Sequence, residues 1–272
     1  MAFCLTYYSN NPTYYLEDVD ELKVKYNPKD IETEKFGELL DKFQNKIIIL
    51  DINKDFNEID GKLLKYYNDK YNNLKVMFDF NNKECLEKVQ KYKLPFFFSN
   101  YVTSFDQLDG YIKYNPTDMY ICEELGFSLE RISNVLHENN IKVRVFPNIC
   151  QSSFIETESI KTFFIRPEDI DIYSQYVDVF ELITDTSRQA VIYKIYKQKK
   201  WIGNINEIIP SFKEPISNAY ILNNFGKIRI KCNKRCNYTS PKKCNLCNEF
   251  IKIAEIMAEK DREFYGNQRD KS

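Results

Sequence analysis

The chain has 272 residues, of which 43% are hydrophobic and 15% aromatic, so the composition predicts a packed globular protein and excludes a disordered one. Its 39 basic and 40 acidic residues nearly cancel, so overall charge does not predict attraction to nucleic acid or membranes. No apolar run approaches the roughly 18 residues of a transmembrane helix. The N-terminus also lacks the features of a secretory signal. We therefore expect a cytoplasmic protein, in a bacterial or phage-infected cell or in a virion.

Short apolar runs alternate with amphipathic segments along the chain. Several runs are apolar at consecutive positions, which is typical of parallel strands covered on both faces. The runs predict eight strands: Phe3–Tyr8, Lys46–Asp51, Leu74–Phe80, Pro95–Ser99, Asp118–Cys122, Ile141–Phe146, Lys161–Ile165 and Asp178–Ile183.

Helical periodicity marks the segments between these strands. It predicts helices over Glu34–Phe43, Asn57–Asn72, Ser128–Asn139 and Ser187–Lys200. Residues 9–29 look irregular, and Pro147–Ser159 is polar without helical spacing, so a loop replaces one helix. The alternation predicts an α/β fold, a (β/α)8 TIM-like barrel, with a doubly wound open sheet as the alternative.

The barrel pattern stops near Trp201, which divides the chain into two parts. Residues 1–200 form the predicted barrel. Residues 201–272 contain a connecting segment, a cysteine cluster and a closing helix, Glu249–Tyr265, which we expect to pack on the barrel.

Four of the eight cysteines form a C-x3-C-x7-C-x2-C cluster near the C-terminus: Cys232, Cys236, Cys244 and Cys247. Two short cysteine pairs joined by a tight loop supply the four thiolates of a tetrahedral zinc site. An iron–sulfur cluster also takes four thiolates, so the spacing leaves iron as the alternative to structural zinc. Disulfides are disfavoured without a secretion signal.

The segment from Lys227 to Lys243 holds seven basic residues and no acidic one. It suggests a small nucleic-acid-binding knuckle, or cations that offset the negative charge of a four-thiolate site. We favour the second interpretation, because Tyr238 is the only aromatic residue available there for base stacking.

Polar residues follow the predicted strands at the end where barrel enzymes place their chemistry. They are Asp51, Asp79, Asn100, Glu123, Asn148, Cys150, Arg166 and Glu181. The catalytic candidates among them are Arg166, Glu123, Glu181 and Cys150. Strand ends in any barrel also become polar where they meet water, so a structural role is the alternative for each.

Other common catalytic patterns are missing from the sequence. The single histidine, His137, falls near the end of a predicted helix, which disfavours a Ser–His or Cys–His pair. None of the seven glycines forms a G-x-G motif, so the sequence predicts no phosphate or dinucleotide loop.

The segment Phe164-Ile165-Arg166-Pro167-Glu168-Asp169, with Val177–Glu181 and Trp201-Ile202-Gly203-Asn204 after it, resembles the collagenase-like peptidases of unassigned catalytic type, peptidase family U-32. The cysteine cluster before a final helix is similar to short members of that family, including a phage and gut-bacterial branch of unknown function. The resemblance covers roughly residues 95–250.

The resemblance implies a (β/α)8-like barrel and two kinds of activity, peptide cleavage and oxygen-independent hydroxylation with an iron–sulfur cluster. Those enzymes carry cysteines in and after the loop that corresponds to Pro147–Ser159, where this chain has only Cys150. We therefore expect a non-catalytic, zinc-stapled component of a protein assembly, such as a phage particle, that contacts other subunits. The alternatives are an enzyme of the peptidase or hydroxylase type and nucleic-acid binding by the basic cysteine tail.

Overall fold

A computed structural model describes residues 1–8, 14–25, 34–52, 56–121, 129–148, 164–209, 216–221, 223 and 225–230, with 252–253, 256–257 and 259–260. The chain divides into two compact units. Unit 1 comprises residues 1–122, 131–146 and 176–190, and unit 2 comprises residues 123–130, 147–175 and 191–272.

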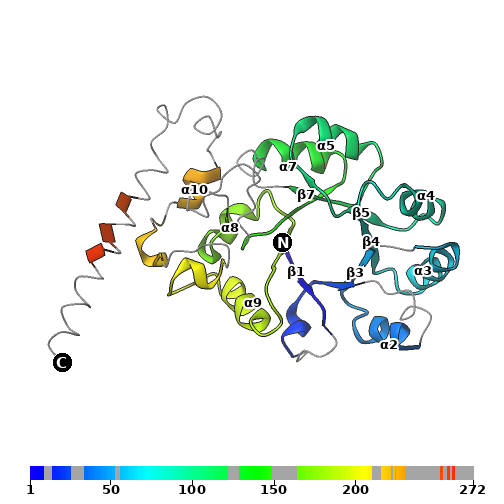
Figure 1. The fold of residues 1–272 in the computed structure, drawn as a ribbon, viewed down its shortest axis with the longest axis horizontal. Coiled ribbons are helices and arrows are strands. Elements are labelled where there is room, and N and C mark those ends of the chain that lie inside the picture. Colours follow the sequence, from blue (N-terminus) through cyan, green and yellow to red (C-terminus); the bar gives the residue numbers. More distant parts are fainter. Residues whose placement is uncertain are drawn as a thin grey trace. The chain divides into compact units, whose positions relative to one another are not determined.

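Unit 1 is built on one sheet of nine parallel strands, in the order β5-β4-β3-β2-β1-β9-β8-β7-β6 (Figure 1). Apolar and β-branched residues dominate most strands, as in Ile47-Ile48-Ile49-Leu50 of β3. The strands are β1 (Ala2–Thr6), β2 (Glu21–Lys25), β3 (Ile47–Ile52), β4 (Leu74–Phe78), β5 (Phe96–Phe98), β6 (Tyr101–Val102), β7 (Asp118–Ile121), β8 (Lys142–Val145) and β9 (Val179–Glu181).

The two ends of this sheet belong to one stretch of chain. Only Ser99 and Asn100 separate β5, which pairs with β4, from β6, which pairs with β7. The amide of Thr117 donates to the carbonyl of Phe96 at 2.7 Å and so joins the start of β7 to β5. The sheet is therefore a nearly closed barrel. This confirms the TIM-like prediction and excludes the open sheet.

One predicted strand, Lys161–Ile165, differs from the structure at the residues that can be compared, and two strands, β2 and β6, were not predicted. Phe164 and Ile165 are not in a strand, and residues 161–163 lie outside the described part of the chain. The strand position between β1 and β3 is instead filled by β2, in the region that looked irregular. Glu21, Lys23 and Lys25 alternate with Leu22 and Val24, so β2 has a two-residue period but no apolar run.

Helices follow most strands, and Figure 1 shows α2 to α5 in succession around the outside of strands β3 to β7. The predicted helices near Glu34, Asn57, Ser128 and Ser187 are all present, within two residues of their expected ends. The helices are α2 (Glu34–Lys42), α3 (Glu58–Tyr71), α4 (Lys83–Lys91), α5 (Phe105–Ile112), α7 (Leu129–Glu138), α8 (Ile170–Tyr173), α9 (Gln189–Gln198) and α10 (Phe225–Ile230), with 3-10 turns η1 (Tyr14–Asp18), η2 (Pro167–Asp169), η3 (Ile205–Glu207) and η4 (Asn218–Tyr220).

Helix α3 shows how local sequence sets these boundaries. The side chain of Asn57 accepts hydrogen bonds from the amides of Ile59 and Asp60, while Asp60 bonds back to the Asn57 amide. The helix ends at Asn72, whose φ of 53° is the left-handed conformation that Asn tolerates better than most residues. These contacts satisfy backbone groups that a helix end leaves without partners.

The inside of the barrel is filled by side chains from alternate positions of the strands. Its apolar part consists of Cys4, Ile49, Met77, Phe97, Tyr120 and Val179. In each strand the residue two positions away points the same way, so the sheet also turns several charged residues inward. Of the described helices, none is both long enough and apolar enough to cross a membrane.

Candidate functional site

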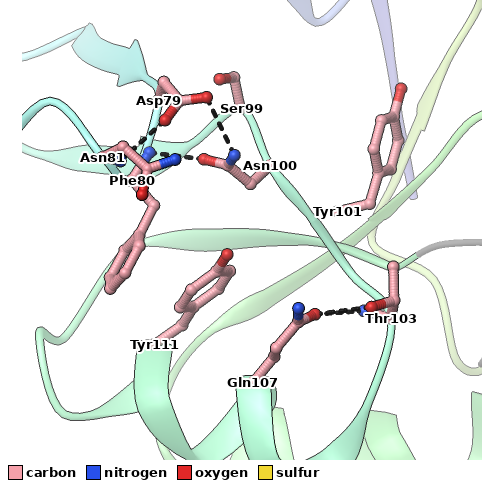
Figure 2. Close-up of a pocket in the computed structure, with 9 residues that line it drawn as sticks. All are labelled: Asp79, Phe80, Asn81, Ser99, Asn100, Tyr101, Thr103, Gln107 and Tyr111. Carbon is pink, nitrogen blue, oxygen red and sulfur yellow. Dashed lines mark hydrogen bonds between the residues drawn. The ribbon is translucent and has the colours of Figure 1, made fainter.

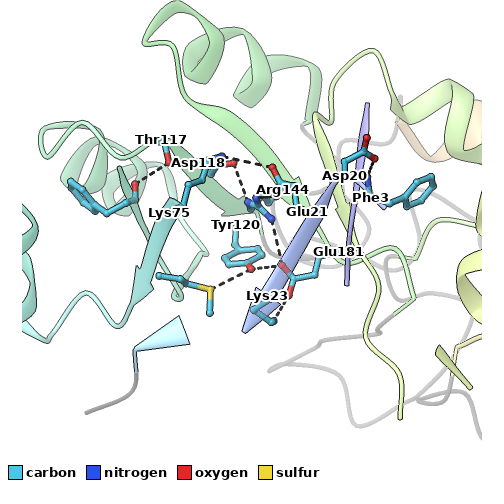
Figure 3. Close-up of polar contacts among 12 residues, drawn as sticks. Phe3, Asp20, Glu21, Lys23, Lys75, Thr117, Asp118, Tyr120, Arg144 and Glu181 are labelled. Carbon is cyan, nitrogen blue, oxygen red and sulfur yellow. Dashed lines mark hydrogen bonds and ion pairs between the residues drawn. The ribbon is translucent and has the colours of Figure 1, made fainter. Parts of the chain in front are cut away.

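Six charged side chains meet inside the barrel of unit 1. They come from five strands, and each is two residues from an interior residue or pairs with one: Glu21, Lys23, Lys75, Asp118, Arg144 and Glu181. Three are cations and three are anions, so their charges cancel. Most barrels fill these positions with Val, Ile or Leu. We call these six residues the interior network (Figure 3).

Arg144 of β8 is the centre of the interior network. Its side chain is fully buried and forms ion pairs with Glu21, with Asp118 at 3.1 Å and with Glu181 at 3.6 Å. The guanidinium carbon also lies 4.7 Å from the centre of the Phe97 ring. Burial, the largest influence, opposes ionisation, yet the attraction of Asp118 and Glu21 raises the pKa of Arg144 well above its usual value.

Lys75 of β4 completes the network near the starts of the strands. Its ammonium lies 2.6 Å from Asp118 and 3.8 Å from Glu21. Burial favours the neutral form of Asp118, but Arg144 and Lys75 outweigh it together, so the pKa of Asp118 lies below its ordinary value. Each of the three carboxyl groups of the network therefore lies next to a cation.

The catalytic candidate Glu181 belongs to this network, and its side chain is only 1% exposed. Its carboxylate pairs with Lys23 and accepts a hydrogen bond from the Tyr120 hydroxyl, besides its contact with Arg144. Burial tends to lower the pKa of Lys23, but Glu181 raises it above the usual value. The arrangement holds Glu181 as a buried, ion-paired carboxylate.

Two further groups lie beside Glu181. Burial raises the pKa of the Asp51 carboxyl, although Lys23 opposes this effect. The Cys4 thiol is completely buried, and burial together with Glu181 raises its pKa well above the ordinary value. A thiol in this environment stays protonated and is a poor nucleophile.

Arg166, the second described candidate, lies in unit 2 at the residue before η2, where Pro167 occupies the first position of the turn. It is 2% exposed and forms a two-point contact with Asp169, at 2.7 and 3.1 Å. It also donates to the carbonyl of Ile221 at 3.3 Å. Burial raises the pKa of Asp169 even though Arg166 opposes this shift. Arg166 thus makes a local ion pair that ties η2 to the segment at Ile221.

The remaining candidates lie outside the described residues. They are the catalytic candidates Glu123 and Cys150 and the predicted metal ligands Cys232, Cys236, Cys244 and Cys247. Within the residues that the structure does describe, no group of three or more His, Cys, Asp or Glu side chains could hold a metal ion. The predicted zinc site therefore stays a prediction.

The single histidine takes part in a surface contact. His137 lies near the end of α7, and its Nε2 is 2.8 Å from a carboxylate oxygen of Asp178. The same oxygen accepts a hydrogen bond from the Val143 amide at 2.8 Å. His137 therefore pairs with a carboxylate at the surface of unit 1.

An open pocket of about 610 Å³ lies where β4 and the β5–β6 segment end (Figure 2). It brings together two of the predicted strand-end polar residues, Asp79 and Asn100, which hydrogen-bond at 3.0 Å. Asp79 also accepts from the Asn81 amide at 2.7 Å. The lining residues are Asp79, Phe80, Asn81, Ser99, Asn100, Tyr101, Thr103, Gln107 and Tyr111.

Sequence reasoning found the strand-end residues but missed the interior network. Arg144 and Lys75 stand inside predicted strands, where a charged residue looks like an exposed position. Glu21 and Lys23 were missed because β2 was missed. The alternation of charged and apolar residues in Glu21–Lys25 was the available signal.

Comparisons with known proteins show a distant relative. No protein-family model matches the chain. Over 103 residues the chain is 33% identical to an uncharacterised protease of Methanocaldococcus jannaschii. The match covers 35% of this chain and 29% of the relative, so most of the relative's length lies outside it.

Among solved structures, the chain is similar to a cube-shaped, porous protein cage designed by fusing symmetric oligomeric domains. The TM-score is 0.45 and the sequence identity is 10%, over 73% of each chain. A similarity at this level gives no information about function.

Proposed function

We propose that this chain is a relative of the collagenase-like peptidases that acts by binding, as a structural or assembly component, and does not cleave peptides. The relationship to a peptidase rests on the partial match to the archaeal protease and on the resemblance of the segment around Arg166. The binding role rests on the burial and ion pairing of the two described catalytic candidates, Glu181 and Arg166.

The observation that carries the proposal is the burial of Glu181 and Arg166. Their side chains are 1% and 3% exposed, and each is paired with an oppositely charged group. A general base or an electrostatic catalyst must reach the reacting atoms within hydrogen-bond distance. In their observed positions, both side chains are bonded to other groups of the protein, and these bonds occupy the atoms that would have to contact a substrate.

Cleavage assays on the full chain test this proposal. We expect no new peptide termini, by mass spectrometry, after incubation with denatured collagen or casein in the presence of zinc or ferrous iron. Glu181→Gln is the informative variant, and Glu58→Gln, whose side chain is 45% exposed at the start of α3, is its matched control. Cleavage that persists in Glu58→Gln and disappears in a folded Glu181→Gln protein would refute the binding role.

We also propose that Cys232, Cys236, Cys244 and Cys247 bind one structural zinc ion. The support is their spacing, because four thiolates so close in sequence suit a tetrahedral site. Metal binding at such a site contributes directly to folding. We expect Cys244→Ser to lose the metal and to lower the melting temperature, while Ser240→Ala in the same segment changes neither. An unchanged zinc content in Cys244→Ser would contradict the assignment.

The alternative is a metal-dependent enzyme of the peptidase or hydroxylase type. It is favoured by the similarity to a protein named as a protease, although this similarity covers only 103 residues. Anaerobic purification separates the two proposals. A colourless protein with one zinc supports the structural role, whereas brown protein containing iron and sulfide supports the enzyme.

A further inference from the structure

Unit 2 contains a carboxylate that is bonded only to neutral groups. Glu168 lies in η2, and its Oε1 oxygen accepts from the Trp201 amide at 2.5 Å and from the Asn218 side chain at 2.9 Å. The other oxygen, Oε2, is buried and has no hydrogen-bond partner among the residues that the structure describes. A buried carboxylate oxygen without a donor or a cation is costly, so a further group is expected beside it.

A second buried oxygen without a partner lies on the neighbouring side chain. Asn218 is 6% exposed, and its NH2 group donates to Glu168 and to the Trp201 carbonyl at 3.0 Å. Both of these partners are acceptors, which fixes the orientation of the carboxamide and makes Oδ1 its remaining polar atom.

The Oδ1 oxygen of Asn218 is also buried and without a partner in the described part of the chain. The 2.9 Å hydrogen bond joins this carboxamide directly to the Glu168 carboxylate. The two partnerless oxygens can therefore be no more than about 7 Å apart, a span that one ion can bridge directly or through a water that it holds.

The surrounding charges indicate what kind of group is missing. Arg166 is bound to Asp169 by two hydrogen bonds, at 2.7 and 3.1 Å. Burial is the main cause of the raised pKa of Asp169, and the negative charge of Glu168 adds to it. One arginine thus serves two carboxylates, so the group carries an excess of negative charge. A water molecule could donate to both partnerless oxygens, but it would not offset this charge.

We propose that Glu168 Oε2 and Asn218 Oδ1 bind one alkali cation, sodium or potassium. Carboxylate and amide oxygens are the ligands of hard cations, and a single positive charge matches the excess of one carboxylate. A divalent ion fits less well, because the described residues contain no group of three His, Cys, Asp or Glu side chains that could hold one. The ion joins η2, the turn at Trp201 and η4, and so stabilises unit 2.

This site goes beyond the proposed assembly role and is separate from the proposed zinc site. Thiolates are soft ligands that select zinc, whereas the two atoms here are hard oxygens. The cation proposal can therefore fail while the other two proposals stand.

Thermal unfolding of the full chain in different chloride salts tests the site. Sodium, potassium and tetramethylammonium chloride are compared at equal ionic strength, because tetramethylammonium is too large to enter a buried site. We expect the melting temperature to rise by about 3 °C or more once sodium or potassium reaches about ten times its Kd. Broadening of the sodium NMR line by the protein, reversed by potassium, measures binding directly.

Glu168→Gln is the informative variant, because it removes the charge and keeps the shape. It should lose both the salt response and the line broadening. In tetramethylammonium it should melt no lower than the original chain, since it no longer buries an uncompensated charge. Asp171→Asn, which removes a carboxylate that is 67% exposed on α8, is the matched control and should keep both responses. Asn218→Ala removes the other ligand and should weaken sodium binding about tenfold.

Three outcomes would overturn the proposal. One is an original chain that melts at the same temperature in all three salts and leaves the sodium line unchanged. Another is a folded Glu168→Gln protein that keeps the salt response. The third is a stability that follows pH and not the cation, which would assign a proton to the space between the two oxygens.

Discussion

Arg144 holds three carboxylates together in a place from which water is excluded. Removing a charge from water costs several kcal/mol, and attraction to opposite charges offsets this cost only while all partners are present. Glu21, Asp118 and Glu181 all contact the one guanidinium. Removing one member of the interior network should therefore cost more stability than the number of its ion pairs suggests. The remaining buried charges would lose a partner.

Replacing Arg144 with methionine should lower the free energy of unfolding by about 3–5 kcal/mol, because it leaves three buried carboxylates short of a cation. Urea denaturation measures the change. Lys142→Met, at an exposed position of the same strand, is the control and should stay within about 0.5 kcal/mol of the original protein. A loss below about 1 kcal/mol in Arg144→Met would mean that water or rearrangement replaces the cation.

The lowered pKa of Asp118 gives stability a defined pH dependence. An acid whose pKa is lower in the folded state stabilises the fold above its unfolded pKa of about 3.9, and this contribution disappears as pH falls through the folded value. The stability difference between the original chain and Asp118→Asn should therefore be large at neutral pH and shrink below about pH 4. Urea denaturation across this range measures it, and a pH-independent difference would contradict the assignment.

The glycines of helices α3 and α5, Gly61 and Gly110, have different surroundings. In α3, a methyl group at Gly61 would come within 2.5 Å of the Tyr92 ring, so the helix and this ring approach closely only because the side chain is missing. In α5, a methyl group at Gly110 would meet nothing within 4 Å. Both glycines cost helix propensity, but only Gly61 has a packing reason to be there.

Alanine substitutions separate these effects. Gly110→Ala should raise the free energy of unfolding by up to about 1 kcal/mol, because alanine is the better helix former. Gly61→Ala gains the same propensity but forces Tyr92 out of place, so it should destabilise the protein by about 1–3 kcal/mol. Thermal or urea denaturation of the two variants is the measurement. Equal stabilisation by both would show that Tyr92 moves aside at no cost.

At the scale of helices and strands, the sequence predicted most elements well. The strands that it did not predict were missed for a physical reason. Apolar runs identified β3, β4 and β5 because those strands are buried on both faces. Strand β2 was not predicted because its inward residues are charged, and a charged residue in a strand normally indicates a position exposed to solvent. Whether an inward lysine has a partner depends on residues far away in sequence, as Lys75 depends on Asp118, and no local pattern contains that information.

Closure of the barrel can be tested through one ion pair. Lys75 lies on β4 and Asp118 on β7, on either side of the β5–β6 segment at which the sheet ends meet. The two side chains are 2.6 Å apart only because the sheet curls round. In an open sheet the same strands would lie at opposite ends.

A double-mutant cycle with Lys75→Met and Asp118→Asn should therefore give a coupling energy of about 1–3 kcal/mol. Urea denaturation of the two single variants and the double variant supplies the values. Lys75→Met combined with Asp109→Asn, which changes an exposed residue without a contact to Lys75, is the control and should be additive. Additivity in the first pair as well would contradict the closed arrangement.

The location of the polar strand ends was predictable from the fold, but their roles were not. Parallel strands place Asp79 and Asn100 at one end of the barrel, and their direct contact follows from the break between β5 and β6. Glu181 and Arg166 were equally plausible from sequence, yet each is bonded inside the protein. Burial depends on the whole packing, so a strand-end residue cannot be assigned to solvent or interior from its position alone.

The nearly closed sheet also limits how this protein can join an assembly. In the described barrel, every strand except β5 and β6 has a hydrogen-bonded neighbour on both sides, and these two end strands are only three and two residues long, so little backbone is left to pair with a strand from another molecule. Addition of a foreign strand, a common way of linking protein subunits, would have only these two short edges of the barrel to use. On the rest of this barrel a partner would meet side chains of the outer helices and loops, where substitutions can change the choice of partner without disturbing the sheet.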